Sequence, residues 1–337
     1  MSSSSTVVAC RLLLTLNNWL ILGVLLMGSM RDGEPLVSVV IPSYNAGEYL
    51  GEAIDSVLRQ TYSKIELIVL DDGSTDETRK LLSAYPESSF FWESHKNIGQ
   101  AATMNKGWAM AKGEILSYLS ADDVLLPEAV TSSVEALFRH ESAIMTYCDY
   151  MLMDEKSEDI RRVYTPKFNY KKMVAEIEVQ PGPGVFFRKI GFEKIGGWNP
   201  GLRQVPDLEY WLRLGLLGDF FHIPDVLAKF RIHEASQTFA ESSIEKTEEC
   251  VRVIHDYFAL ADLPADIKLL ENSSKSHAHF YAARLHLRAG RYRGLYKNFW
   301  AAYKIDHTSI FSLRMVKLLG NGLLFRLKRI FSKALGG

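Results

Sequence analysis

Val37-Ser38-Val39-Val40-Ile41-Pro42 is a short, β-branched apolar run that ends at a proline, and it decides the fold. Such a run is typical of a strand buried on both faces of a parallel sheet. Residues 44–47 then carry turn chemistry. Residues 50–58 place apolar side chains at spacings of three and four, which predicts an amphipathic helix. The first unit of the chain is therefore a strand, a turn and a helix.

The same alternation continues to about residue 120. Residues 65–70 form a second apolar run, and Ser74 with Glu77 has the spacing of a capping box that would start a second helix. Phe90-Phe91-Trp92 suggests a third strand, residues 101–111 a helix, and residues 115–119 a further strand. Alternating strands and helices predict an α/β fold with a Rossmann-like, mostly parallel sheet flanked by helices.

Polar residues follow three of these strands at the point where each strand ends. Ligands of such sheets bind beyond the carboxyl ends of the strands. Any one of these groups could be a solvated turn, but three at one edge favour a binding site. They are Tyr44 with Asn45, Asp71 with Asp72, and Asp122 with Asp123.

The second half of the chain is patterned differently. Residues 127–139 predict a helix and residues 143–147 a strand, whereas residues 151–179 are polar and irregular. Residues 191–231 combine a Gly-Gly-Trp turn, a helix and a strand, and the pattern is helical from residue 244 onward. We therefore expect four regions: an N-terminal extension over 1–34, a nucleotide-binding half over 35–125, an acceptor half over 126–240, and a helical C-terminal region over 241–337.

Composition sets broad limits on location and partners. The 337 residues have a formal net charge of −1, which gives no reason to expect a nucleic-acid partner. The cysteines at positions 10, 148 and 250 form no CxxC pair, which favours a reduced, cytoplasmic location. Residues 7–27 are mostly apolar and could be a signal peptide or weak anchor. Alternatively, Met30 is the true start and the upstream stretch is not part of the native protein.

The aspartates after the strands suggest metal and nucleotide chemistry. A hard divalent cation prefers oxygen ligands and stabilises a departing diphosphate, and Asp122-Asp123 could supply them. Taken alone, that pair is as well explained as a helix cap or a turn. Asp72 could accept a hydrogen bond from the imide of a pyrimidine base, although an Asp-Gly turn explains it too.

Several longer motifs resemble those of family 2 glycosyltransferases. They are the runs 37–45, 56–61, 69–76 and 97–107, with Ala121-Asp122-Asp123 where the family has its DXD-type metal motif. The resemblance implies a GT-A fold and an inverting transfer of a sugar from a nucleoside-diphosphate donor. It also implies donor-binding residues, namely Pro42, Tyr44, Asn45, Asp72, Gly99, Asn105 and Asp122. Asp123 would bind Mn²⁺ or Mg²⁺.

The resemblance extends to residue 233 with two departures. Met104 stands where the family often has an arginine, and Lys106 is a weak candidate to replace it. Pro206 stands where the family has a glutamate, but Asp207 matches the aspartate that acts as general base, with Glu209 as the alternative. His233, in an Arg-x-His motif, could be a further metal ligand or contact the diphosphate. Trp198 shapes the acceptor entrance or packs in the core.

The function expected from this resemblance is sugar transfer to a hydroxyl, with UDP- or dTDP-sugar as donor and a glycan or lipid-linked acceptor. The alternatives are a sugar nucleotidyltransferase and a non-catalytic sugar-nucleotide-binding module. The C-terminus is basic and apolar, which predicts either peripheral membrane contact or a helix packed on the catalytic domain. Its basic residues are Arg314, Lys317, Arg326, Lys328, Arg329 and Lys333.

Overall fold

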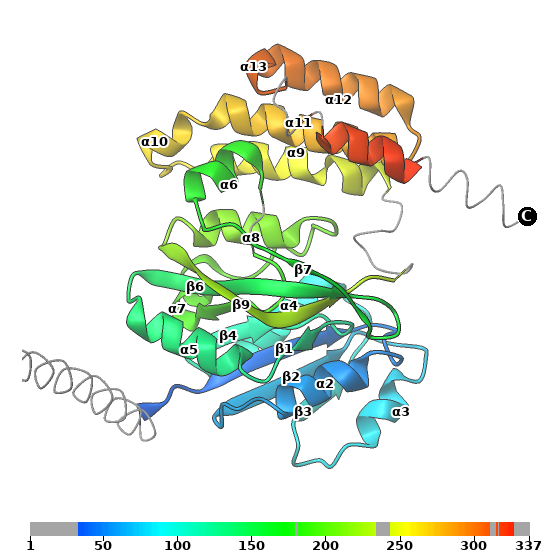
Figure 1. Cartoon of the computed structure of the whole chain (residues 1–337), viewed down its shortest axis with the longest axis vertical. Coiled ribbons are helices and arrows are strands. Elements are labelled where there is room, and N and C mark those ends of the chain that lie inside the picture. The colour runs from blue at the N-terminus through cyan, green and yellow to red at the C-terminus, as the bar shows by residue number, and fades with distance from the viewer. Residues whose placement is uncertain (1–32, 179–180, 234–242, 311–314, 316, 327–337) are drawn as a thin grey trace, which may run out of the picture.

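The computed structural model describes residues 33–178, 181–233, 243–310, 315 and 317–326. A single curled sheet lies below a layer of helices (Figure 1). The strands of the sheet are β1 (Val37–Ser43), β2 (Ile65–Asp71), β3 (Phe91–Ser94), β4 (Ile115–Tyr118), β5 (Val124–Leu125), β6 (Ala143–Met153), β7 (Asp159–Val163), β8 (Phe186–Arg188) and β9 (Asp219–Arg231).

Strand order is β3-β2-β1-β4-β8-β6-β9-β5, with β7 paired to β6. The first four strands are parallel, and β1 runs between β2 and β4 with Val37 opposite both Ile65 and Ile115. The second half is mixed: β8 is antiparallel to β4 and β6, whereas β6 and β9 are parallel. The predicted α/β fold is confirmed, and the antiparallel pairs lie in its second half.

Helices cover both faces of this sheet, and the central strand explains why. All seven residues of β1 are buried. Val40 packs in one hydrophobic cluster, with residues of α4 (Gln100–Met110), whereas Val39 and Ile41 pack in another, with α2 (Leu50–Leu58) and α5 (Ala129–Arg139). Successive strand side chains point to opposite faces, so an unbroken apolar run requires cover on both sides.

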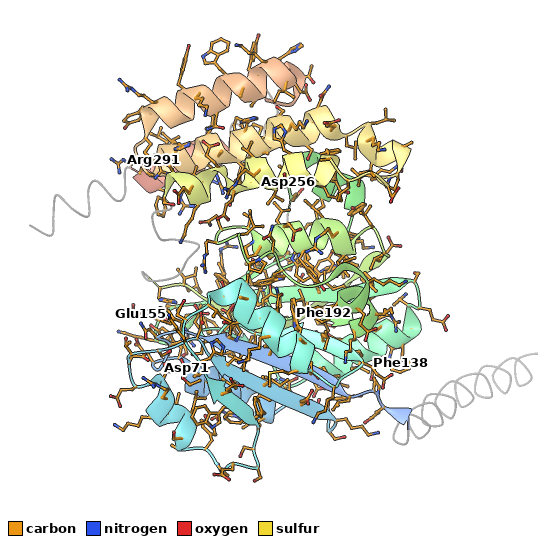
Figure 2. The ribbon with its side chains drawn as sticks, turned by 180° about the vertical axis from the view of Figure 1, so that it is seen from behind. Asp71, Phe138, Glu155, Phe192, Asp256 and Arg291 are labelled. Carbon is orange, nitrogen blue, oxygen red and sulfur yellow. The ribbon has the colours of Figure 1, made fainter. Side chains whose placement is uncertain are left out.

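The remaining helices are α3 (Thr78–Ser83), α6 (Tyr170–Glu176), α7 (Lys189–Ile195), α8 (Pro206–Leu214), α9 (Ile244–Phe258), α10 (Ala265–Lys268), α11 (Glu271–Arg288), α12 (Tyr292–Ile305) and α13 (His307–Ile310). The run α9–α13 confirms the helical pattern predicted from residue 244. Helices α9, α11 and α12 form a layer stacked above α8 (Figure 1). Seen from behind, Asp256 and Arg291 lie in this upper layer and Asp71 lies in the sheet below (Figure 2).

Two local predictions were wrong. The capping box at Ser74 and Glu77 does not form: the helix begins at Thr78, and Glu77 makes no side-chain cap. The Ser74 hydroxyl instead accepts a hydrogen bond from the backbone of Asn45, because the two loops meet at the sheet edge. The region 151–179, read as irregular, contains β7 and α6. β7 is a short edge strand whose pattern is polar because half of it faces solvent.

Both chain ends fall largely outside the described residues. Residues 1–32, the region of the expected extension, are not described, and neither are Arg314, Lys328, Arg329 and Lys333 of the basic C-terminus. Across the described part of the chain, we find no helix long and apolar enough to cross a membrane.

Candidate functional site

The loops after β1 and β2 are tied together at the predicted sheet edge. Asn45 adopts a left-handed conformation with φ of 50°, which asparagine tolerates better than most residues. Its side-chain oxygen accepts from the Thr75 N–H at 2.8 Å, while its own N–H donates to Ser74 Oγ at 2.8 Å. Tyr44 is 54% exposed, whereas Pro42 is buried within β1. Of these two predicted donor-binding residues, Tyr44 therefore has its ring at the surface.

Asp72 fastens the turn that precedes α4. Its side chain is buried, and its two carboxylate oxygens accept from the N–H of Ile98 at 2.6 Å and of Gly99 at 2.9 Å. Each carboxylate oxygen has a second lone pair, so these bonds leave capacity to accept from a nucleobase. The structure thus assigns Asp72 a loop-holding contact, and its predicted contact with the base stays a prediction.

Gly99 lies beneath an arginine from the second half of the chain. Its φ of +89° is a conformation that favours glycine, and a Cβ at this position would be 2.8 Å from Cζ of Arg203. Met104 stands where the family often has an arginine. Lys106, the weak candidate to replace that arginine, is paired with Glu93, with its Nζ 2.6 Å from Glu93 Oε1. Arg203 is therefore the cation that the fold brings to the start of α4, which sequence reasoning missed.

Asn105 joins α4 to the Gly-Gly-Trp turn. Its amide nitrogen donates to the Trp198 carbonyl at 2.7 Å, and its oxygen accepts from the Trp198 N–H at 2.7 Å. Trp198 is itself buried, with its ring centroid 5.7 Å from Trp108 and 5.1 Å from Tyr118. The structure therefore supports packing for Trp198 and shows Asn105 holding this turn in place.

Asp122 and His233 meet at the end of β4. His233 Nε2 lies 3.0 Å from Asp122 Oδ2, and the His233 ring is 5.1 Å from the ring of Tyr49. Both side chains keep some exposure, 28% for Asp122 and 14% for His233. The predicted ligand His233 thus lies beside Asp122, and its predicted role at the metal stays a prediction.

Asp123 is the buried member of the pair. Its Oδ1 accepts from the Arg231 N–H at 3.0 Å. Burial and the neighbouring Asp122 carboxylate raise the pKa of Asp123 well above its usual value, and the lowering by Arg231 and Ser120 does not offset this. Adjacent carboxylates of this kind leave excess negative charge that a cation would stabilise.

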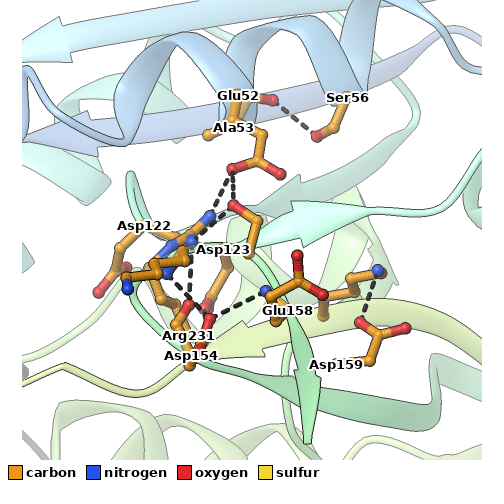
Figure 3. Close-up of polar contacts among 12 residues, drawn as sticks. Glu52, Ala53, Ser56, Asp122, Asp123, Asp154, Glu158, Asp159 and Arg231 are labelled. Atoms are coloured by element: carbon orange, nitrogen blue, oxygen red, sulfur yellow. Dashed lines mark hydrogen bonds and ion pairs between the residues drawn. The ribbon is translucent and has the colours of Figure 1, made fainter.

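Arg231 lies at the centre of a polar network that holds this end of the site (Figure 3). Its side chain is 1% exposed and its guanidinium lies 4.6 Å from the Tyr49 ring. The guanidinium donates to the Asp122 carbonyl at 2.9 Å, the Asp154 carbonyl at 3.1 Å and the Glu52 carboxylate at 2.5 Å. The Arg-x-His motif pointed to this residue, but sequence reasoning assigned a role only to its histidine.

Asp207, the predicted base, lies in the first turn of α8. Pro206 occupies the start of the helix, where its missing N–H costs nothing. Asp207 Oδ1 accepts from the Leu208 N–H at 2.8 Å, and burial raises the pKa of this carboxyl above its usual value. The alternative base, Glu209, makes a two-pronged ion pair with Arg213 at 2.6 and 2.7 Å. Asp207 is the less engaged of the two carboxylates.

Glu249 of α9 fixes the segment that leads into α8. Its buried carboxylate accepts from three successive backbone N–H groups, those of Arg203 at 3.0 Å, Gln204 at 2.5 Å and Val205 at 3.4 Å. Charge-assisted hydrogen bonds of this kind are among the stronger ones in proteins. The helical layer thereby positions both Arg203 and the start of the helix that carries Asp207.

Tyr118, the last residue of β4, relates the two ends of the site. Burial and then the charges of Asp207 and Asp123 raise the pKa of its phenol. Within the described residues, however, no group of three or more histidine, cysteine, aspartate or glutamate side chains could hold a metal ion.

Comparison with known proteins identifies the family. A sequence model described as Glycosyl transferase family 2 matches residues 38–196. An uncharacterized glycosyltransferase of Rickettsia prowazekii (strain Madrid E) is 34% identical over 224 residues, which are 64% of this chain and 69% of that protein. The chain belongs to glycosyltransferase family 2. Chondroitin synthase of Escherichia coli is 26% identical over 227 residues, 66% of this chain but 32% of the synthase.

Solved structures confirm the GT-A fold of this glycosyltransferase. Residues 1–349 of S. aureus TarS superpose with a TM-score of 0.62 at 16% identity, covering 90% of this chain and 92% of that one. The mannosyltransferase PcManGT from Pyrobaculum calidifontis, in complex with GDP-Man and Mn²⁺, gives a TM-score of 0.56 at 18% identity, covering 87% and 81%. At these identities the likeness concerns the fold alone.

Proposed function

We propose that this family 2 glycosyltransferase moves one sugar from a UDP- or dTDP-sugar to a hydroxyl of a glycan or lipid-linked acceptor, with inversion. The observation that carries the proposal is the family 2 match over residues 38–196, with Asp72, Asp122 and Asp123 in the loops that follow β2 and β4. The charges of Asp207 and Asp123 both raise the pKa of Tyr118, which supports a common site for the predicted metal ligand and the predicted base. The product would serve cell-surface polysaccharide or glycolipid synthesis, as the chondroitin synthase relative suggests.

The donor site is proposed at the edge formed by β1, β2 and the start of α4. Tyr44 offers an exposed ring for stacking on a base, and Asp72 offers carboxylate oxygens. Asn45, Gly99 and the more exposed Asp122 would line the same donor. TarS has been solved with UDP-GlcNAc and PcManGT with GDP-Man, so the fold accommodates more than one base. Asp72 favours a base with an imide N–H.

No three histidine, cysteine, aspartate or glutamate side chains of the described residues form a metal group, so we propose that two such side chains hold a divalent cation together with oxygens of the donor diphosphate. One oxygen and one nitrogen donor suit Mn²⁺, and oxygen alone would suit Mg²⁺. Burial and then the Asp122 carboxylate raise the pKa of Asp123, and a bound cation would favour its ionised form. Asp123 and His233 are the proposed ligands, and Asp122 would orient the ribose or diphosphate. When bound, the cation would stabilise charge on the leaving diphosphate.

Asp207 is the proposed general base. It would take the proton from the acceptor hydroxyl as that oxygen attacks the anomeric carbon. One base without an enzymic nucleophile implies a single displacement, which inverts the anomeric configuration. NMR of the product tests this: a product with the configuration of the donor would exclude a single displacement.

Donor turnover is the experiment that tests the function. We expect metal-dependent release of free nucleoside diphosphate from a UDP- or dTDP-sugar, abolished by excess chelator and by Asp123→Ala. A nucleotidyltransferase would instead release pyrophosphate from a nucleoside triphosphate and a sugar phosphate, and a binding module would release nothing. Full activity of Asp123→Ala, or of the wild type in chelator, would exclude the metal assignment.

We also propose a cytoplasmic location with peripheral contact at the membrane. Lys317 and Arg326 are the described members of the basic C-terminal set, on the helix over 317–326. Lys317 is exposed, whereas Arg326 is half-buried with its guanidinium against Gly290. Basic amphipathic helices bind anionic surfaces through their charge and their apolar face. Co-sedimentation with anionic liposomes at low and high salt, with and without residues 309–337, tests this. Equal sedimentation of the two proteins would contradict the proposal.

A further inference from the structure

A cavity of about 400 Å³ lies between α8 and the helical layer. Asp207 and Leu208 line it from α8, and α11 faces them. Residues of α11 on its wall include Phe280, Tyr281 and Arg284. The cavity thus brings the proposed base and a cationic side chain of the C-terminal helices to one partly open space.

Hydrogen bonds between the walls hold this space open. Glu249 of α9 binds the backbone just before α8, as described above. Tyr170 of α6 donates to the Leu212 carbonyl of α8 at 2.7 Å and lies 2.6 Å from the hydroxyl of Tyr257 on α9. Three of the helices around the cavity are therefore joined by polar contacts, and the cavity is preformed rather than a chance gap.

Arg284 is the unusual group in this cavity. Its guanidinium lies 5.0 Å from the Tyr281 ring, and its buried Nε has no hydrogen-bond partner among the described residues. Buried donors are nearly always satisfied in proteins, so an Nε without a described partner leaves the Arg284 guanidinium, on the cavity wall, under-used by the protein itself.

The charges of Arg284 and Asp207 both affect the pKa of the Tyr281 phenol. Burial raises the pKa of Tyr281, the Arg284 guanidinium lowers it, and the Asp207 carboxylate raises it. Asp207, Tyr281 and Arg284 all line the cavity, so a molecule in it could contact Arg284 and Asp207 together. Guanidinium donors match carboxylate and phosphate oxygens in geometry and charge.

We propose that this cavity binds the acceptor, with Arg284 pairing to an anionic group, phosphate or carboxylate, while the acceptor hydroxyl lies at Asp207. This inference rests on the proposed function, in which Asp207 is the base. It adds a substrate class: the acceptor is an anionic glycan or polyol, and the C-terminal helices select it. Phe280, Met315 and Leu318 supply an apolar wall beside the charged one.

Direct binding of small anions tests the inference without knowledge of the full acceptor. Glycerol 3-phosphate and glucuronate are compared with neutral glycerol and glucose by saturation-transfer NMR, with UDP and Mn²⁺ present to fill the donor site. We expect the wild type to bind at least one anion and neither neutral compound. The anion that binds better identifies phosphate or carboxylate as the recognised group.

The matched variants are Arg284→Gln and Arg252→Gln, the second on an exposed position of α9. Arg284→Gln should weaken anion binding about tenfold or more, a loss of about 1.4 kcal/mol or more, and Arg252→Gln should not change it. Should Arg284→Gln unfold, Arg284→Lys keeps the charge without the planar fork and should bind with intermediate affinity. Wild type that binds no anion, or equal binding by Arg284→Gln and wild type, would overturn the inference.

Donor turnover separates this inference from the proposed function. Release of nucleoside diphosphate to water uses the donor site, and it is measured in the wild type alongside anion binding. Wild type that binds the anions but releases no nucleoside diphosphate would defeat the proposed function while leaving the anion site standing. Wild type that turns over donor but ignores the anions would defeat the inference alone.

Discussion

Replacing Arg231 by methionine removes a buried guanidinium while keeping a side chain of similar length. The change deletes hydrogen bonds to the carbonyls of Asp122 and Asp154, to Ser157 Oγ and to the Glu52 carboxylate. The backbone N–H that bonds Asp123 remains. The loop that carries the two aspartates therefore loses its side-chain support without losing its main-chain pairing.

The expected cost follows from these contacts. Each of the three uncharged acceptors loses a bond worth about 1 kcal/mol net. The Glu52 partner is 41% exposed, so its ion pair adds about 1 kcal/mol after screening by solvent. The free energy of unfolding should therefore fall by about 4 kcal/mol.

Urea denaturation followed by far-UV circular dichroism measures this loss, with an unchanged slope against urea as the check on two-state behaviour. Arg252→Met is the matched control, because Arg252 is exposed, and it should change the free energy of unfolding by no more than about 0.5 kcal/mol. The Mn²⁺ concentration for half-maximal donor turnover should rise in Arg231→Met only. A stability loss below about 1 kcal/mol would refute the assigned role of the network.

Three further changes test the remaining parts of the site. Asp207→Asn should lower the transfer rate by a factor on the order of 10²–10⁴ with donor affinity nearly unchanged, and collapse of donor binding would instead place Asp207 in the nucleotide site. Because burial raises the pKa of Asp207, wild-type activity should fall with decreasing pH at a value above about 3.9. Because burial disfavours the ionised carboxylate, Asp207 lowers the free energy of unfolding at neutral pH. The melting temperature of Asp207→Asn at pH 7 should therefore be no lower than that of wild type, and a clear drop in it would contradict the burial argument. Gly99→Ala should lower the free energy of unfolding by about 1–2 kcal/mol because of the positive φ, and it should weaken donor binding because the new Cβ displaces Arg203. If the double variant Gly99→Ala/Arg203→Ala binds donor no worse than Gly99→Ala, the loss of affinity comes from the displacement of Arg203. Unchanged donor binding in Gly99→Ala would show that Arg203 has no part in donor binding. Glu249→Gln should lower the transfer rate more than the donor affinity, because it weakens the hydrogen bonds that hold the segment before α8. An unchanged transfer rate would show that catalysis does not depend on these bonds.

Local sequence patterns determined the first half of the fold and one edge of the site. The β-branched run over Val37–Ser43 could only be a strand buried on both faces, which requires helices on both sides and a parallel sheet. Asp72 directly follows β2 and Asp122 lies in the loop after β4, so their place at the carboxyl edge followed from the alternation alone. The chemistry of that edge depends on residues close in sequence to strand ends, and local patterns report such residues well.

The tertiary structure decided which distant side chains meet there. Arg203 lies over Gly99, Arg231 supports the loop of Asp122, and Arg284 shares a cavity with Asp207. Nothing local in the sequence distinguishes Arg203 and Arg284 from exposed arginines, and the Arg-x-His motif marked Arg231 without giving its role. Their roles depend on burial and on partners contributed by other elements. The capping box at Ser74 failed for the same reason, because a long-range contact with Asn45 used the hydroxyl that the local pattern had assigned to a helix.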